Sequence, residues 1–133
     1  NKGIIRVNRK EVPVIKAAGS CSDSELRKKV DEFKQNARSR SIAQSDMQGA
    51  TITLSNFGTI TGRYATPIIV PPAVAILGCG RSREVPVVKN GQIMPGKLLP
   101  LSLTFDHRAA TGGEATRFLG AVIQYLQKEI DPV

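Results

Sequence analysis

The side chains with the clearest potential for catalysis are those of His107 and Ser55. His107 is the only histidine in the chain, and it follows the apolar segment 101–105 and precedes Gly112 and Gly113. Catalytic side chains are often mounted where a rigid strand ends in a loop before a helix. An imidazole there could act as a general base, although a lone histidine is more often a packing or hydrogen-bonding residue. The residues alone leave both interpretations open.

Ser55 lies in a second segment of interest, which runs from Thr53 to Gly58. This β-like run ends in a small hydroxyl residue and a glycine, so the hydroxyl would face a loop or cleft. Serine at such a place is also a common turn residue. The chain has no G-x-S-x-G pattern of the serine hydrolases. It has no C-x-x-C pair or cluster of histidines either, so we expect no zinc site, and Cys21 and Cys79 are expected to be reduced, unpaired thiols.

Two segments have the periodicity of amphipathic helices. Ser22 followed three residues later by Glu25 forms a capping box, which predicts the start of the first helix. The apolar residues of this helix recur at steps of four, three and four, which places them on one face. A second helix is predicted over about residues 113–130. The apolar residues are Leu26, Val30, Phe33 and Ala37 in the first helix and Phe118, Val122, Leu126 and Ile130 in the second.

Several short β-like runs accompany these helices. Residues 73–78 are almost wholly apolar, as expected for a strand covered on both faces. Asn90-Gly91 predicts a tight hairpin turn, and two prolines after residues 67–70 place that run at an edge or bend. The order of elements predicts an α/β domain with a mixed sheet and flanking helices. The predicted strands are residues 12–15, 51–54, 67–70, 73–78, 85–88, 93–94 and 98–105.

Composition restricts the possible partners. The 133 residues carry a net charge of +8, but aromatic residues make up only 5% and tryptophan is absent, so we expect no nucleic-acid binding. The positive residues are scattered, which favours solvated surfaces, with attraction of a phosphorylated small molecule as the functional alternative. No apolar run reaches the roughly 18 residues of a membrane helix, so no membrane partner is expected. The missing initiating Met suggests that the chain begins partway through a longer protein.

Asp106-His107-Arg108 followed by Gly112 closely resembles the motif of dihydrolipoyl acyltransferases, the core components of 2-oxo acid dehydrogenase complexes. Further matches occur in the right order from about residue 11 to residue 130, and several ordered motifs are far more specific than one triplet. These matches are residues 12–15, 49–58, 64–69, 72–78, 98–103 and 117–119.

The resemblance implies a fold like that of chloramphenicol acetyltransferase, in trimers whose active sites lie between subunits. It identifies residues 1–133 as the C-terminal portion of the acyltransferase catalytic domain, without its N-terminal half, the lipoyl domain or the subunit-binding segment. Such a fragment is not expected to be stable or active alone. The implied reaction moves an acyl group between the thiol of dihydrolipoamide and coenzyme A, with the lipoyl group carried on a domain outside this chain.

The resemblance also assigns roles to residues. His107 of one subunit would be the general base that deprotonates a thiol, and Ser55 of the neighbouring subunit would stabilise the oxyanion of the tetrahedral intermediate. Asp106, Arg108, Thr111 and Gly112 would support the site. The family usually has aspartate where this chain has Thr111, and a hydroxyl cannot supply that carboxylate's charge. A neutral hydrogen bond would therefore replace an ion pair, or the activity would be reduced.

Two alternative functions remain open from the sequence. The chain could belong to a catalytically impaired structural core that organises a multienzyme complex, or to a free-standing acetyltransferase for a small molecule. The resemblance implies that the chain forms a homotrimer assembled into a larger shell. The implied partners are a 2-oxo acid decarboxylase/dehydrogenase and dihydrolipoamide dehydrogenase. The expected location is cytoplasmic, or the mitochondrial matrix in a eukaryote. The sequence leaves the acyl group (acetyl, branched-chain or succinyl) and the shell geometry undetermined.

Overall fold

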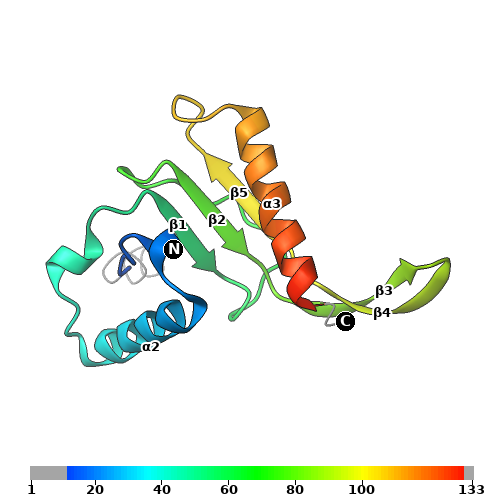
Figure 1. Cartoon of the computed structure of the whole chain (residues 1–133), viewed down its shortest axis with the longest axis horizontal. Helices are drawn as coiled ribbons and strands as arrows, with labels where there is room; N and C mark the ends of the chain where they lie inside the picture. Colours follow the sequence, from blue (N-terminus) through cyan, green and yellow to red (C-terminus); the bar gives the residue numbers. More distant parts are fainter. Residues whose placement is uncertain (1–11, 131–133) are drawn as a thin grey trace. The chain divides into compact units, whose positions relative to one another are not determined.

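The computed structural model describes residues 12–130, which form two compact units divided between Ala50 and Thr51 (Figure 1). In its described part, residues 12–50, the first unit contains one long helix and two short 3-10 helices. The second contains both sheets and the C-terminal helix. Residues 1–11 and 131–133 lie outside the described part of the chain. No helix among the described residues is long and apolar enough to span a membrane.

The long helix α2 (Asp23–Ser39) confirms the first predicted helix. Its capping box is present: the Ser22 backbone N–H donates to Glu25 Oε2 at 2.7 Å, and the Glu25 N–H donates to Ser22 Oγ at 3.4 Å. These bonds satisfy two of the backbone donors that a helix start leaves open. They also lower the pKa of Glu25, chiefly through the Ser22 backbone N–H. The half-buried positions of α2 include all four residues of the predicted apolar stripe: Leu26, Val30, Phe33 and Ala37.

The predicted strand at residues 12–15 is wrong. Among the described residues this segment has no strand partner, and the backbone N–H of Val14 donates instead to Asp46 O, at 2.7 Å. Val12 is half exposed, and Pro13 has no N–H to contribute to a ladder. The other short elements of this unit are the 3-10 helices η1 (Ala18–Ser20) and η2 (Gln44–Met47).

The second unit is built on a three-stranded mixed sheet, as predicted. Its strands are β1 (Ile52–Asn56), β2 (Ala75–Cys79) and β5 (Leu101–Phe105), in the order β1-β2-β5. β1 runs parallel to β2, and β2 runs antiparallel to β5. Helix α3 (Gly112–Ile130) follows β5 and lies beside it (Figure 1).

A separate two-stranded hairpin, β3 (Arg83–Lys89) and β4 (Gln92–Leu98), confirms the turn prediction. Asn90 and Gly91 have φ values of 53° and 76°. Two successive positive φ angles are those of a type I′ turn, whose twist matches that of the flanking strands.

Two strand predictions in this region need correction. Residues 98–105 are not one strand, because β4 ends at Leu98 and β5 begins only after Pro100, which cannot donate to a ladder. Residues 67–70 form no strand. They begin at Pro67 and run into two further prolines, and Ile68 is 84% exposed. A short apolar run therefore did not suffice to form a strand where proline removes backbone donors.

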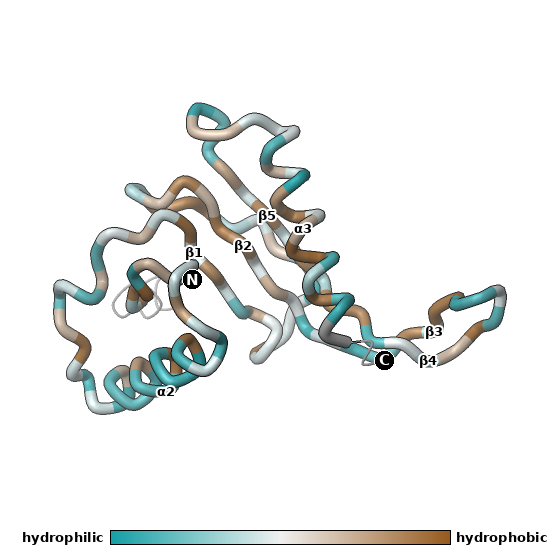
Figure 2. The backbone as a smooth tube through the Cα atoms, viewed as in Figure 1, coloured by the Kyte–Doolittle hydropathy of each residue, from teal (hydrophilic) through white to brown (hydrophobic). Residues whose placement is uncertain are grey.

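The register gives the three-stranded sheet two chemically different faces. In-register residues point to the same side of a sheet, and successive residues alternate. One face is mainly apolar, and Figure 2 shows hydrophobic residues within β2 and β5. The opposite face carries four hydroxyl groups. The apolar rows are Ile52–Ala75–Phe105, Leu54–Leu77–Leu103 and Asn56–Cys79–Leu101, and the opposite rows are Thr53–Ile76–Thr104 and Ser55–Gly78–Ser102.

The core of this unit is small. Among the described residues, the buried hydrophobic ones are Ala73, Leu77 and Ala115. Leu54 on the apolar face of β1 stays 69% exposed, which leaves apolar surface uncovered on that strand. The half-buried Cys79 on the same face is a free thiol whose pKa is raised by burial, and Cys21 is free as well.

Helix α3 confirms the second predicted helix, and two residues of its predicted apolar side, Val122 and Leu126, are half-buried. The less exposed residues recur at steps of four, three and four from Ala115. Phe118 is 42% exposed instead. Each step of four residues shifts the column by about 40° around a 3.6-residue helix, which places Phe118 nearer the edge of the inward face. The less exposed residues are Ala115, Leu119, Val122 and Leu126, and the side chain of Ile130 lies outside the described part.

Candidate active site

His107 lies in the loop between β5 and α3, and its side chain is exposed. Its ring contacts that of Phe105, with centroids 5.5 Å apart and planes tilted by 37°. Among the described residues, no hydrogen bond to either imidazole nitrogen is found. Both nitrogens are therefore open to a ligand or to another chain.

The residues on both sides of His107 are bound to each other. Asp106 Oδ1 accepts from the Arg108 backbone N–H at 2.9 Å and from Arg108 Nε at 3.0 Å, and Asp106 Oδ2 accepts from Arg108 Nη2 at 2.7 Å. Hydrogen bonds from the Arg108 side chain, and then from its backbone, lower the pKa of Asp106 to about 2. The carboxylate is therefore charged at neutral pH, and it accepts from three donors of one residue.

We predict that the Asp106–Arg108 interaction depends on pH in the acid range. Because the folded chain lowers this carboxyl pKa from 3.8 to about 2, the folded state binds the proton less readily than the unfolded state. The stabilisation is present above the unfolded pKa and is lost as pH falls from about 4 to about 2. A carboxyl titration by NMR should give an Asp106 pKa near 2, and Arg108→Ala should raise it towards 3.8. An unchanged pKa in Arg108→Ala would contradict the pairing.

Thr111 caps the N-terminus of α3. Its backbone N–H and its hydroxyl both donate to Glu114 Oε2 at 2.8 Å, and the Glu114 N–H donates to Thr111 Oγ1 at 3.3 Å. The bond from the Thr111 backbone N–H is the main cause of a lowered pKa for Glu114. The neutral side chain of Thr111 therefore caps the helix, and the carboxylate that contacts position 111 belongs to Glu114.

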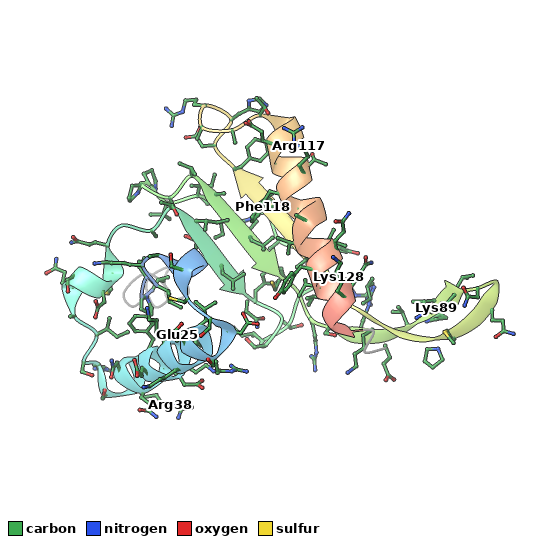
Figure 3. The ribbon with its side chains drawn as sticks, in the orientation of Figure 1. Glu25, Arg38, Lys89, Arg117, Phe118 and Lys128 are labelled. Atoms are coloured by element: carbon green, nitrogen blue, oxygen red, sulfur yellow. The ribbon has the colours of Figure 1, made fainter. Side chains whose placement is uncertain are left out.

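Gly112 is the first residue of α3, and its carbonyl accepts from Thr116 Oγ1 at 2.7 Å. A Cβ added at Gly112 would meet no atom within 4 Å. The described part of the chain thus gives no steric reason for glycine at this position. The charges of α3 suit its dipole, with Glu114 in the first turn and Lys128, labelled in Figure 3, in the last.

We predict that losing the Thr111 cap destabilises the second unit. Thr111→Val keeps the shape of the side chain but removes the hydroxyl, and loss of an N-cap typically costs about 1 kcal/mol. Thr111→Asp should stay close to the parent, because aspartate is an equally good N-cap residue. The free energies of unfolding in urea would be compared for the three proteins. Equal values for Thr111→Val and the parent would show that the cap contributes nothing.

Ser55 lies on β1, half-buried, on the hydroxyl face of the sheet. Its in-register neighbour on β2 is Gly78. A Cβ at Gly78 would come within 2.9 Å of the Phe57 ring and 3.5 Å of Pro67. Glycine thus leaves room for the segment after β1 to approach the sheet beside Ser55. Among the described residues, no hydrogen bond to Ser55 Oγ is found.

The fold keeps Ser55 and His107 apart within one chain. Val74 accepts from the backbone N–H of Asp106 and donates to Thr51 O, so Asp106 lies level with Thr51 on β1. Ser55 lies four residues further along β1, and β2 lies between β1 and β5. With a rise of about 3.3 Å per residue and about 4.8 Å between strands, the backbones of Ser55 and Asp106 are roughly 16 Å apart. The structure therefore brings Asp106, Arg108, Thr111 and Gly112 around His107, but not Ser55.

Two residues of this region were not singled out from the sequence. Glu114 was detectable, because Thr111 followed three residues later by glutamate is a capping box. Gly78 carried no usable signal, because its closeness to Phe57 depends on the tertiary path of the chain. No group of three or more potential metal ligands is found in the described part of the chain.

Known proteins share this sequence and fold. Residues 11–132 match the family described as 2-oxoacid dehydrogenases acyltransferase (catalytic domain). A dihydrolipoyllysine-residue acetyltransferase component of the pyruvate dehydrogenase complex from Mycoplasma capricolum is 42% identical over 119 residues. The match covers 90% of this chain and 27% of that protein. The chain therefore spans only about a quarter of the length of this relative.

Solved structures agree with the sequence match. The dihydrolipoamide acetyltransferase of Azotobacter vinelandii superposes with a TM-score of 0.76 at 39% identity, covering 84% of this chain and 46% of that one. The cubic core of a pyruvate dehydrogenase multienzyme complex superposes with a TM-score of 0.75, also at 39% identity, covering 82% and 45%. With its mixed sheet and flanking helices, the chain belongs to the family of 2-oxoacid dehydrogenase acyltransferases, within the catalytic domain.

Proposed function

We propose that this chain is the C-terminal portion of an acyltransferase catalytic domain that moves an acyl group between the thiol of dihydrolipoamide and coenzyme A. The family match over residues 11–132 supports the reaction class. The observation that carries the proposal is the loop 106–111, which presents an exposed imidazole with no hydrogen bond among the described residues, between two residues that are bound to each other. The net charge of +8 favours the approach of a phosphorylated substrate such as coenzyme A.

His107 acts as the general base. The nucleophile in thiol chemistry is the thiolate, while a free thiol with a pKa near 8.5 is mostly protonated at neutral pH. An imidazole nitrogen of His107 accepts the thiol proton as sulfur attacks the thioester carbonyl, and the protonated imidazole returns the proton to the departing thiolate. Such general-base catalysis typically contributes about 10²–10⁴-fold.

Ser55 stabilises the oxyanion. Attack by sulfur converts the carbonyl oxygen into an oxyanion, and the Ser55 hydroxyl donates a hydrogen bond to it. Removing one such donor typically costs about 3 kcal/mol of transition-state stabilisation. Since the acyl group passes directly from one bound thiol to the other, no acyl-enzyme is formed on Ser55.

Residue spacing in a relative supports these roles. The A. vinelandii structure is described as an investigation of a serine, a histidine and an asparagine in the catalytic mechanism of that enzyme. In that enzyme the histidine follows the serine by 52 residues and the asparagine follows the histidine by four. The same intervals separate Ser55, His107 and Thr111 here. Asparagine and threonine are both good N-cap residues, which is consistent with the cap that Thr111 provides.

The active site forms between subunits, because one chain holds the backbones of Ser55 and Asp106, the neighbour of His107, roughly 16 Å apart. In a trimer, His107 of one subunit faces Ser55 of its neighbour. Trimers of this protein build a larger shell, as the cubic core of a solved relative suggests. The lipoyl group comes from a domain outside this chain, and the partners are a 2-oxo acid decarboxylase/dehydrogenase and dihydrolipoamide dehydrogenase. The complex works in the cytoplasm, or in the mitochondrial matrix of a eukaryote.

A thiol-acyl transfer assay on the full-length parent protein tests this function. We expect transfer from acetyl-coenzyme A to dihydrolipoamide, since the Mycoplasma capricolum relative is named an acetyltransferase. Branched-chain and succinyl donors would be assayed in parallel. Inactivity with all three donors would favour a structural core, with Thr111 as the first residue to revert to aspartate. Transfer to chloramphenicol but not to dihydrolipoamide would indicate a free-standing acetyltransferase instead.

A further inference from the structure

The loop that carries His107 is held by hydrogen bonds of its neighbours, while no hydrogen bond to the imidazole itself is found among the described residues. Among the described residues, the imidazole has a ring contact with Phe105 and no hydrogen bond. Catalytic histidines are often oriented by a partner on the second ring nitrogen. Here the described residues offer no such partner, so the direction of the Cα–Cβ bond of His107 depends on the backbone of the loop.

Asp106 anchors that loop from three directions. Its N–H donates to Val74 O at 2.8 Å, which ties it to the residue just before β2. Its carbonyl accepts from the backbone N–H groups of Ala109 and Ala110, at 2.9 and 3.1 Å. Its carboxylate accepts from the backbone N–H of Arg108 at 2.9 Å. A side-chain oxygen bound to a backbone N–H two residues on closes a turn around the residue between them, and here that residue is His107.

The side chain of Arg108 adds two hydrogen bonds to this turn. Its Nε and Nη2 donate to the two oxygens of the same carboxylate, at 3.0 and 2.7 Å. The planar guanidinium fork matches a carboxylate in a way that a lysine ammonium does not. The Arg108 side chain is 90% exposed and that of Asp106 is 27% exposed. An ion pair this exposed contributes little to global stability, which separates its local effect on the loop from an effect on the whole fold.

We propose that Asp106 and Arg108 are positioning residues that form a clamp across His107 and hold its imidazole in the direction required for proton transfer. This proposal rests on the general-base role of His107. The clamp affects the reaction only through the position of His107. Loss of the clamp therefore lowers kcat and leaves the affinity for coenzyme A unchanged.

Kinetics of the full-length parent protein test the clamp. A displacement of about 1 Å in a catalytic group can cost on the order of 100-fold in rate. We expect Asp106→Ala and Arg108→Ala each to lower kcat by about 10- to 100-fold, with KM for coenzyme A within about twofold of the parent. The kcat of Arg108→Lys should lie between those of Arg108→Ala and the parent, because lysine keeps the positive charge but cannot make the paired guanidinium–carboxylate bonds.

A double-mutant cycle gives the sharpest outcome. If the two residues act as one clamp, the double variant should be no slower than the slower single variant. The matched control is Asp31→Ala with Lys34→Ala, which removes another exposed ion pair, 3.1 Å long, from α2. These control variants should leave both kcat and KM unchanged.

Several results would overturn the clamp. A raised KM with unchanged kcat in Arg108→Ala would mean that Arg108 contacts the substrate directly. If the losses of kcat in the two single variants multiply in the double variant, Asp106 and Arg108 have independent roles. A parent-like kcat in all variants would mean that the pair does not affect catalysis. Failure of even Arg108→Lys and Asp106→Asn to assemble would mean that the pair serves only the structure. The variant His107→Ala separates failure of the clamp from failure of the proposed function. Full activity of His107→Ala refutes the general base. An inactive His107→Ala together with fully active clamp variants refutes only the clamp.

Discussion

Replacing His107 with alanine should lower kcat for acyl transfer by about 10²–10⁴-fold, the usual contribution of a general base. The imidazole is exposed and, among the described residues, carries no hydrogen bond that folding would lose with it. The variant should therefore fold and assemble like the parent. The measurement is the steady-state rate of transfer from acetyl-coenzyme A to dihydrolipoamide by the full-length protein, with assembly checked by size.

His107→Gln is the matched control for this prediction. Glutamine keeps a polar, hydrogen-bonding side chain but cannot accept the thiol proton, so it should be nearly as slow as alanine. A parent-like rate for His107→Gln would mean that position 107 supplies a hydrogen bond and no base. A parent-like rate for both variants would remove His107 from the mechanism.

Replacing Ser55 with alanine should lower kcat by about 10²–10³-fold, the cost of losing one oxyanion donor. KM should change little, because the oxyanion exists only after sulfur has attacked. The same transfer assay measures both constants.

The control for Ser55 lies on the same face of the sheet. Ser102 is in register with Gly78, which lies between it and Ser55, and its hydroxyl accepts from the Ala65 N–H at 3.5 Å. Ser102→Ala removes a hydroxyl from that face without touching the proposed donor, so its rate should stay near that of the parent. Equal losses in both variants would indicate that the face as a whole supports the fold, with no special role for Ser55.

Local signals predicted the elements around the site well. The capping box at Ser22 and Glu25 gave the start of α2, and Asn90-Gly91 gave the hairpin turn, because each is decided by neighbouring residues. The mixed sheet followed from the order of the elements. The loop that carries His107 was likewise predictable from a strand that runs into glycines and a helix.

Tertiary features were less accessible. Residues 12–15 and 67–70 look like strands, yet a strand forms only where another strand can pair with it, and proline weakens both runs. The clamp between Asp106 and Arg108 depends on side-chain geometry that spacing does not reveal. The distance between Ser55 and His107 required the register of three strands. Thr111, which looked like a lost charge in the sequence, is a helix cap in the structure.

A site shared between two subunits is the central claim, and mixing two inactive variants tests it most directly. His107→Ala and Ser55→Ala subunits would be co-expressed in equal amounts, and acyl transfer by the purified assembly would be compared with that of each variant alone. If each site takes His107 from one subunit and Ser55 from another, random mixing should restore about a quarter of the parent activity. If the mixture stays as inactive as the separate variants, the two residues do not meet across an interface, and the account is contradicted.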